Sequence, residues 1–157
     1  MSEIRSINGG KLHGVKTSIF TIMNQEKYDP KAIPAAWQDF FSKLPSTGLP
    51  NSGLFYGATI PSNDINVPMT YIAGTFLHSS QMAPESFDSV EVPSGNYFCF
   101  LHRGPITDLA KSYGLAYGVE LPQSGHQMRN APHLEIYESS KDPMSPDYEM
   151  TIAIPIS

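Results

Sequence analysis

The segment His133-Leu134-Glu135-Ile136-Tyr137 carries one acidic residue between a histidine and a tyrosine. Side chains alternate between the two faces of a β-strand, so Glu135 lies on the face opposite to Leu134 and Ile136. We expect Leu134 and Ile136 to face the helices of the fold. A carboxylate on a face crowded with rings loses hydration, so it requires hydrogen bonds, a proton or a cation that arrives from outside.

Aromatic residues on neighbouring predicted strands can complete such a site. Tyr71, Phe98, Phe100 and Tyr56 lie in those strands, and Tyr137 follows Glu135 on the same face. The face of each ring attracts a cation by roughly 0.5 to 2 kcal/mol. The carboxylate and these rings therefore predict a pocket for an apolar, planar and often cationic molecule.

Each candidate also has an ordinary structural interpretation. Glu135 alone is typical of a solvated residue on an exposed strand face. Trp37 shares one helical face with Phe40, so it is a core residue first and a ligand-binding candidate second. Tyr117 stands at helical spacing from Tyr113, which favours packing and leaves for function only a hydroxyl that points to the pocket.

The sequence lacks the patterns of several common active sites. Two histidines never stand at the spacing of zinc ligands on one helix, and His133 is interpreted as a cap of the loop before its strand. The glycine fingerprint of dinucleotide sites, the phosphate-binding loop and the Gly-x-Ser-x-Gly elbow are missing. Cys99 lies inside an apolar run and is expected to be a buried thiol. We therefore expect no metal, no cofactor and no serine-hydrolase chemistry.

Similar stretches in the two halves indicate an internal duplication. Leu54-Phe55-Tyr56-Gly57 and Met69-Thr70-Tyr71-Ile72-Ala73 correspond to residues 133–137 and to Met150-Thr151-Ile152-Ala153, with an offset of roughly 80 residues. We expect two βαββ units, at about residues 11–78 and 88–157, related by a pseudo-twofold axis. They predict an α+β fold with a concave antiparallel sheet, helices on one face and a ligand cleft at the seam.

Periodicity and turn residues place the individual elements. Residues 1–10 lack a pattern and are expected to be a loose lead-in to a single domain at residues 11–157. Strands are expected at residues 11–22, 54–60, 69–77, 96–102, 133–137 and 148–156, and residues 79–91 are expected to cross between the units as a linker. The first helix carries Trp37 and stops at Pro45, and the second begins near residues 105–108 and is interrupted at Gly114 and Gly118.

Composition limits the classes of function. The chain of 157 residues has a formal net charge of -5, and its ten Lys and Arg residues are scattered, which argues against direct binding of nucleic acid. One cysteine excludes an internal disulfide framework, so the cytoplasm is the expected location. No signal leader opens the chain, and no apolar stretch approaches the roughly 18 residues of a membrane span, so no membrane partner is expected.

The second half of the chain also carries a family resemblance. Leu121-Pro122-x-Ser124-Gly125-x-x-Met128-Arg129-x-Ala131-Pro132, running into Leu134-Glu135-x-Tyr137 and a last strand to Ile156, resembles the GyrI-like small-molecule-binding family. The first half matches through Gly14-Val15, the helix with Trp37, and residues 54–57. This family includes the effector-binding domains of AraC-type and multidrug-sensing MerR-type bacterial transcription regulators, and the stand-alone DNA gyrase inhibitory proteins.

The resemblance implies a role for one residue and three hypotheses for the protein. Glu135 matches the pocket glutamate that faces cationic ligands in this family. No helix-turn-helix precedes the domain in this sequence, so the leading hypothesis is a stand-alone protein that captures amphipathic or cationic small molecules. A second hypothesis is a hydrolase that opens strained cyclopropane rings of toxic natural products, with Glu135 as general base. A third is a modulator that binds a protein partner such as DNA gyrase.

Overall fold

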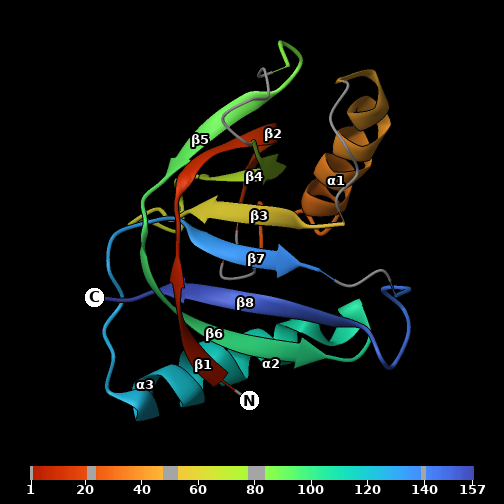
Figure 1. Ribbon diagram of the computed structural model, residues 1–157. Coiled ribbons are helices and arrows are strands. Elements are labelled where there is room, and N and C mark those ends of the chain that lie inside the picture. Colours follow the sequence, from red (N-terminus) through yellow and green to blue (C-terminus); the bar gives the residue numbers. More distant parts are fainter. Residues whose placement is uncertain (1, 21–23, 48–52, 78–83, 139–140) are drawn as a thin grey trace.

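The computed structural model describes residues 2–20, 24–47, 53–77, 84–138 and 141–157 of the chain. Parts of several predicted segments lie outside these residues, namely residues 21–22 of the first strand, residues 79–83 of the linker between the units, and His78. Figure 1 shows the arrangement of the helices and strands. In the described part of the chain, no helix has the length and apolar character needed to cross a membrane.

The strands form one antiparallel sheet, which confirms the predicted α+β class. Their order in the sheet is β1-β6-β8-β7-β3-β4-β2-β5. The strands are β1 (Ser2–Ile7), β2 (Gly10–Ile19), β3 (Phe55–Ile60), β4 (Met69–Phe76), β5 (Asp88–Val92), β6 (Gly95–Arg103), β7 (His133–Tyr137) and β8 (Glu149–Pro155).

The same order of elements occurs twice along the chain. In each half, a strand, a helix and a hairpin follow one another, as β2-α1-β3-β4 and β6-α2-β7-β8. The two halves meet at β3 and β7, which pair antiparallel at the centre of the sheet with Gly57 opposite Glu135. The seam of the predicted duplication therefore places the candidate acid in the middle of the molecule.

The N-terminal residues do not form the loose lead-in that the sequence predicts. Ser2–Ile7 is strand β1, which pairs with β6, and β2 continues from it to pair with β5. The register runs on without a shift, from Ser2 opposite Phe100 to Gly14 opposite Asp88. In Figure 1 the two red strands follow one another across the ends of the others. This continuous ribbon joins both ends of the sheet, so the sheet curls into a nearly closed ring.

The predicted linker between the two halves likewise contains a strand. Asp88–Val92 is β5, and it leads directly into β6 as β1 leads into β2. The sequence pattern misses both strands because they lie at sheet edges with much of their surface exposed, so they lack a strong apolar alternation.

Two helical segments cover one face of the sheet, as predicted. The first comprises α1 (Ala32–Lys43) and the short η1 (Leu44–Thr47). The second comprises η2 (Ile106–Asp108), α2 (Leu109–Leu115), the π-helical η3 (Ala116–Glu120) and α3 (Leu121–Ser124). The predicted interruption at Gly114 and Gly118 corresponds to the change from α-helix to π-helix. A side chain added at either glycine would meet no atom within 4 Å, so neither is needed for close packing.

Both faces of the sheet are buried, and the assignment of β7 to these faces differs from the prediction. Leu134 and Ile136 belong to the core inside the curled sheet, which also contains Leu12, Ile72 and Tyr97. We call this the inner face and the helix-covered side the helix face. Because Leu134 and Ile136 point inward, Glu135 points to the helix face, opposite to what their apolar character predicts. The sequence cannot distinguish the faces here because apolar residues line both.

Deleting Ser2–Ile7 tests whether β1 is part of the fold. Six cross-strand pairs at roughly 0.2 to 1 kcal/mol each predict a loss of about 1 to 6 kcal/mol in the free energy of unfolding. Urea denaturation followed by tryptophan fluorescence measures this change. An unaltered midpoint would show that the segment is a loose lead-in after all.

Candidate functional site

The carboxylate of Glu135 is buried at the seam and held by three phenols. Glu135 is 8% exposed. The hydroxyls of Tyr71 and Tyr137 donate to Oε1 at 2.9 and 2.8 Å, and the hydroxyl of Tyr113 donates to Oε2. A hydrogen bond to a charged acceptor contributes roughly 1.5 to 3 kcal/mol, so three donors offset much of the cost of burying this group.

Trp37 extends this network by one bond. Its Nε1–H donates to the hydroxyl oxygen of Tyr71 at 2.9 Å. Its ring also meets the ring of Tyr137 edge to face, with the centroids 5.1 Å apart. Because Tyr71 accepts from the indole and donates to Glu135, the indole fixes the direction of the Tyr71 hydroxyl. The network thus connects α1 and β4 of the first half with α2 and β7 of the second.

Gly57 provides the space in which these groups meet. It is the cross-strand partner of Glu135 at the seam. A Cβ atom at this position would lie 2.2 Å from the hydroxyl oxygen of Tyr71 and 2.8 Å from Oε1 of Glu135. Any side chain here would therefore push the phenol and the carboxylate apart.

A second aromatic pair lies beside the carboxylate. Tyr117 and Nδ1 of His133 form a hydrogen bond of 2.5 Å, and their rings stack with the centroids 5.8 Å apart. Tyr117 also stacks on Tyr113 at 6.0 Å. Burial lowers the pKa of His133, which favours the neutral imidazole. These rings lie beside the carboxylate network, with Tyr113 and Tyr117 on the second helical segment and His133 on β7.

The charge of Glu135 has no cationic partner in the described part of the protein. None of the four ion pairs found there includes this residue. Burial, and next the negative charge of Glu135, raise the pKa of Tyr71, Tyr113 and Tyr137 well above the usual tyrosine value. Within the same residues, no three His, Cys, Asp or Glu side chains come together as metal ligands. The site therefore offers one buried acid with neutral hydrogen-bond donors around it.

The structure brings together four of the residues that the sequence selects. Glu135, Tyr71 and Tyr137 are in direct contact, and Trp37 joins them through Tyr71 although its first interpretation is a core residue. Tyr117 lies at the edge of the same group, where it contacts His133 and not the carboxylate.

Three further candidates lie elsewhere. Phe98 and Phe100 are buried in the core beneath the second helical segment, because β8 separates their strand from β7. Tyr56 is on the inner face, where its ring contacts Phe76 at 4.7 Å. Its placement beside the carboxylate is wrong, because Tyr56 precedes Gly57 and strand alternation turns it away from Glu135.

Sequence reasoning misses three contributors to the site. Helical spacing assigns Tyr113 to packing, although it binds Glu135 directly. Alternation places His133 on the face of Glu135, but its interpretation as a loop cap leaves it out of the predicted site. Gly57 has no signal of its own, because its importance depends on the strand that pairs with it.

The raised tyrosine pKa values predict a loss of stability at alkaline pH. In the unfolded chain these phenols ionise near pH 10, whereas in the fold they remain neutral at higher pH, so the free energy of unfolding falls as the pH rises above about 10. Urea midpoints measured between pH 8 and 11 should show this decline. It should be shallower in Glu135→Gln, because the carboxylate charge contributes to the shifts, and an equal slope would contradict this coupling.

Gly57→Ala tests the close approach at the seam. The added methyl group should lower the free energy of unfolding by about 1 to 3 kcal/mol, as overpacking does in other cores. Gly118→Ala is the matched control, because its Cβ would meet no atom within 4 Å. Chemical denaturation compares the two variants, and equal stability would refute the role of Gly57.

Sequence comparison connects this geometry with known proteins. Residues 21–157 match the GyrI-like small molecule binding domain. The chain is also 23% identical over 147 residues to the transcriptional regulator BrlR of Pseudomonas aeruginosa, covering 90% of this chain and 54% of the regulator. It thus spans about half the length of that relative.

Solved structures share the fold. SAV2435, solved with bound tetraphenylphosphonium, has a TM-score of 0.72 at 21% identity, with 100% of this chain and 94% of that chain covered. A putative transcription regulation protein from Staphylococcus aureus MU50 has a TM-score of 0.69 at 20% identity, with 100% and 98% covered. A hydrolase from Listeria innocua is more distant, with a TM-score of 0.55 at 13% identity and 99% and 91% covered.

The match extends over most of the chain and includes the strand that carries Glu135. The sequence of this chain and its fold both agree with that domain family. The chain belongs to the GyrI-like family of small-molecule-binding domains.

Proposed function

We propose that the seam binds lipophilic organic cations with aromatic groups, and that Glu135 supplies the opposite charge. The observation that carries this proposal is a buried carboxylate that is surrounded by rings and has no cationic partner among the described residues. Attraction between opposite charges is much stronger in such a poorly solvated site than in water. A cation that is itself weakly hydrated gains this attraction at little cost in lost hydration.

The rings explain why the cation should be aromatic. Trp37, Tyr137, Tyr113 and Tyr117 present faces and edges around the carboxylate. Ring faces attract a cation, and flat rings stack on flat ligands. A small hydrated cation would use neither property, so the site favours large planar or propeller-shaped ions.

Tyrosine hydroxyls cover both oxygens of the carboxylate. Tyr113 donates to Oε2 from α2, while the other two phenols share Oε1. Of the three donors, Tyr113 alone comes from a helix and not from the central strands. Entry of a ligand therefore requires Tyr113 to leave Oε2, which exchanges one hydrogen bond for contact with a full positive charge.

The comparisons support the same class of ligand. Tetraphenylphosphonium, bound to SAV2435, is a lipophilic aromatic cation, and BrlR is a transcriptional regulator. By analogy, we extend the proposal to several cations of this type and to a cytoplasmic role in sensing or buffering them.

The contacts of Glu135 favour capture of the ligand over its hydrolysis. A general base must accept a proton from a water molecule within hydrogen-bond distance. Both oxygens of Glu135 already accept bonds from tyrosines, so a water molecule would have to compete with fixed donors. Mass spectrometry of a bound compound after long incubation should accordingly return it unchanged.

Titration with tetraphenylphosphonium tests the proposal. We expect saturable binding by calorimetry, and Glu135→Gln should weaken it by about tenfold to a hundredfold, or roughly 1.4 to 2.8 kcal/mol. The neutral analogue triphenylphosphine oxide should bind weakly and equally to both proteins.

Glu138→Gln is the matched control for this experiment. It removes the same charge three residues further along, from a side chain that lies near Arg5 on the inner face. Binding of the cation should be unchanged in this variant. If both variants weaken binding equally, the effect is one of net charge and the role of Glu135 is refuted.

A further inference from the structure

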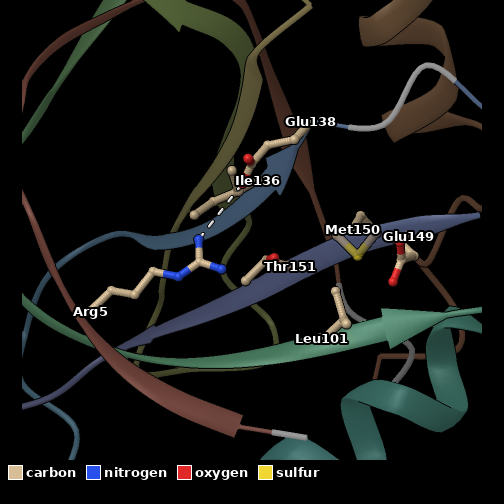
Figure 2. Close-up of a pocket in the computed structure, with 7 residues that line it drawn as sticks. All are labelled: Arg5, Leu101, Ile136, Glu138, Glu149, Met150 and Thr151. Atoms are coloured by element: carbon tan, nitrogen blue, oxygen red, sulfur yellow. Dashed lines mark ion pairs between the residues drawn. The ribbon is translucent and has the colours of Figure 1, made fainter.

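A hollow lies on the inner face, away from the helices and from Glu135. Its volume is about 310 Å³. Figure 2 shows the side chains that surround it on β6, β7 and β8 and at Glu138 directly after β7, with Arg5 reaching over from β1. Leu101, Ile136 and Thr151 form its floor, and Glu138 and Glu149 stand at its rim.

The strand register explains why these residues meet. Thr151 pairs with Leu101 on one side and with Ile136 on the other, which gives one row across three strands. Glu138 and Glu149 each lie two positions from a member of this row, so they belong to the next row on the same face. Two carboxylates thus flank the end of the hollow, Glu149 on β8 and Glu138 directly after β7.

Thr151 is a buried polar residue whose hydroxyl has no partner among the residues that the structure describes. Among the described residues, the buried polar side chains are Asn24, His102, Glu135 and Thr151. The first three form side-chain hydrogen bonds. Thr151 is 5% exposed and its hydroxyl bonds to no residue in the described part of the chain. No fully sealed polar side-chain atom there lacks a partner, so the hydroxyl is open to the hollow.

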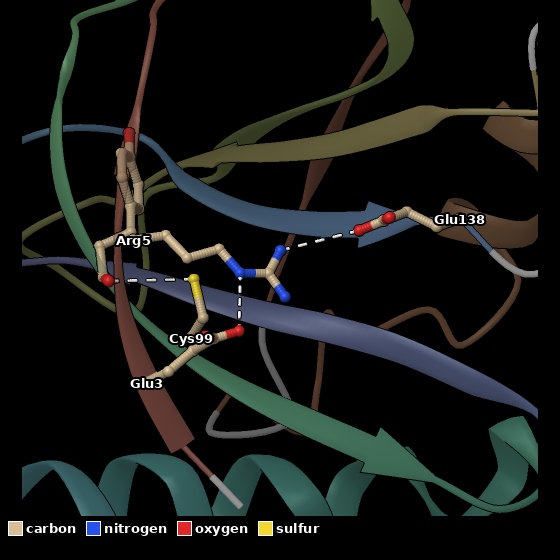
Figure 3. A network of polar contacts seen from close by, with 5 residues as sticks. Glu3, Arg5, Cys99 and Glu138 are labelled. Atoms are coloured by element: carbon tan, nitrogen blue, oxygen red, sulfur yellow. Dashed lines mark hydrogen bonds and ion pairs between the residues drawn. The ribbon is translucent and has the colours of Figure 1, made fainter.

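The charges around the hollow favour a cation over an anion. Arg5 is already shared by two carboxylates, since its Nε lies 3.0 Å from Glu3 and its Nη1 lies 3.7 Å from Glu138. Figure 3 shows the guanidinium between these two groups. Glu149 takes part in none of the four ion pairs found in the described residues. Arg103, the cross-strand partner of Glu149 on β6, pairs with Asp147 at 3.8 Å. The hydroxyl of Thr151 and a carboxylate outside these ion pairs therefore remain as acceptors for a ligand.

We propose that this hollow binds a primary alkylammonium group of the kind carried by linear diamines. Such a group has three N–H donors, and the hollow presents the hydroxyl of Thr151 and the carboxylate of Glu149 as acceptors, with the carboxylate that Glu138 shares with Arg5 beside them. The methylene chain packs on Leu101 and Ile136. This ligand is small and well hydrated, unlike the aromatic cations proposed for Glu135, and the two sites lie on opposite faces of the sheet.

Calorimetric titration with 1,4-diaminobutane at low ionic strength tests the proposal. We expect saturable binding to the wild-type protein, and about tenfold weaker binding in both Glu149→Gln and Thr151→Val. Glu91→Gln, which removes an exposed charge from β5, should bind as the wild type does. Absence of saturable binding up to about 10 mM diamine would overturn the proposal.

Two further measurements distinguish binding in this hollow from binding at the seam and from a structural role of Thr151. Thr151→Val keeps the shape of the side chain and removes a hydroxyl without a partner, so thermal unfolding without ligand should occur at the same or a higher temperature. A lower unfolding temperature would reveal a structural bond of the hydroxyl and contradict the proposal. Glu135→Gln should leave diamine binding unchanged, and loss of binding in that variant would place the diamine at the seam.

Discussion

The burial of one carboxylate without a cationic partner among the described residues is the constraint on which the site depends. Glu135 can be buried at the seam because phenols from both halves of the duplication turn their hydroxyls towards it, and because Gly57 leaves room for them. Each element has to be in register for this arrangement to exist. A slip of one residue in β7 would exchange the acid for an apolar side chain and leave the phenols without an acceptor. The candidate site and the pairing of the two halves are therefore one structural feature.

The continuous ribbon of β1-β2 and β5-β6 gives the sheet two buried faces with different chemistry. It joins both ends of the sheet, so the inner face becomes a closed apolar core and the helix face receives the rings. Where the inner core ends, the polar side chains of β7 and β8 meet Arg5 around a hollow. Strand β7 thus turns Glu135 to the helix face and Ile136 to the hollow, because successive side chains of a strand point to opposite faces of the sheet.

Particular residues show how far local pattern reaches. Strand alternation and family resemblance suffice to find Glu135, Tyr71 and Tyr137, and the fold class and the family are confirmed. The predicted orientation of β7 is wrong because both of its faces are buried, so apolar residues at alternate positions do not identify the helix side. Tyr56 is misplaced because only the pairing of β3 with β7 shows that Gly57, and not Tyr56, stands opposite Glu135. Edge strands β1 and β5 escape detection because their exposed surfaces weaken the apolar signal.

The sequence by itself determined the duplication, the α+β class, the alternation around Glu135 and the family, because these depend on residue types at short spacing or on the resemblance of a long stretch. Only the tertiary structure decided that Tyr113 reaches the carboxylate, that Gly57 has to be glycine, and that the hydroxyl of Thr151 has no partner among the described residues. These facts depend on contacts between segments far apart in the chain. Such contacts are fixed by the register and curvature of the whole sheet, which no local pattern records.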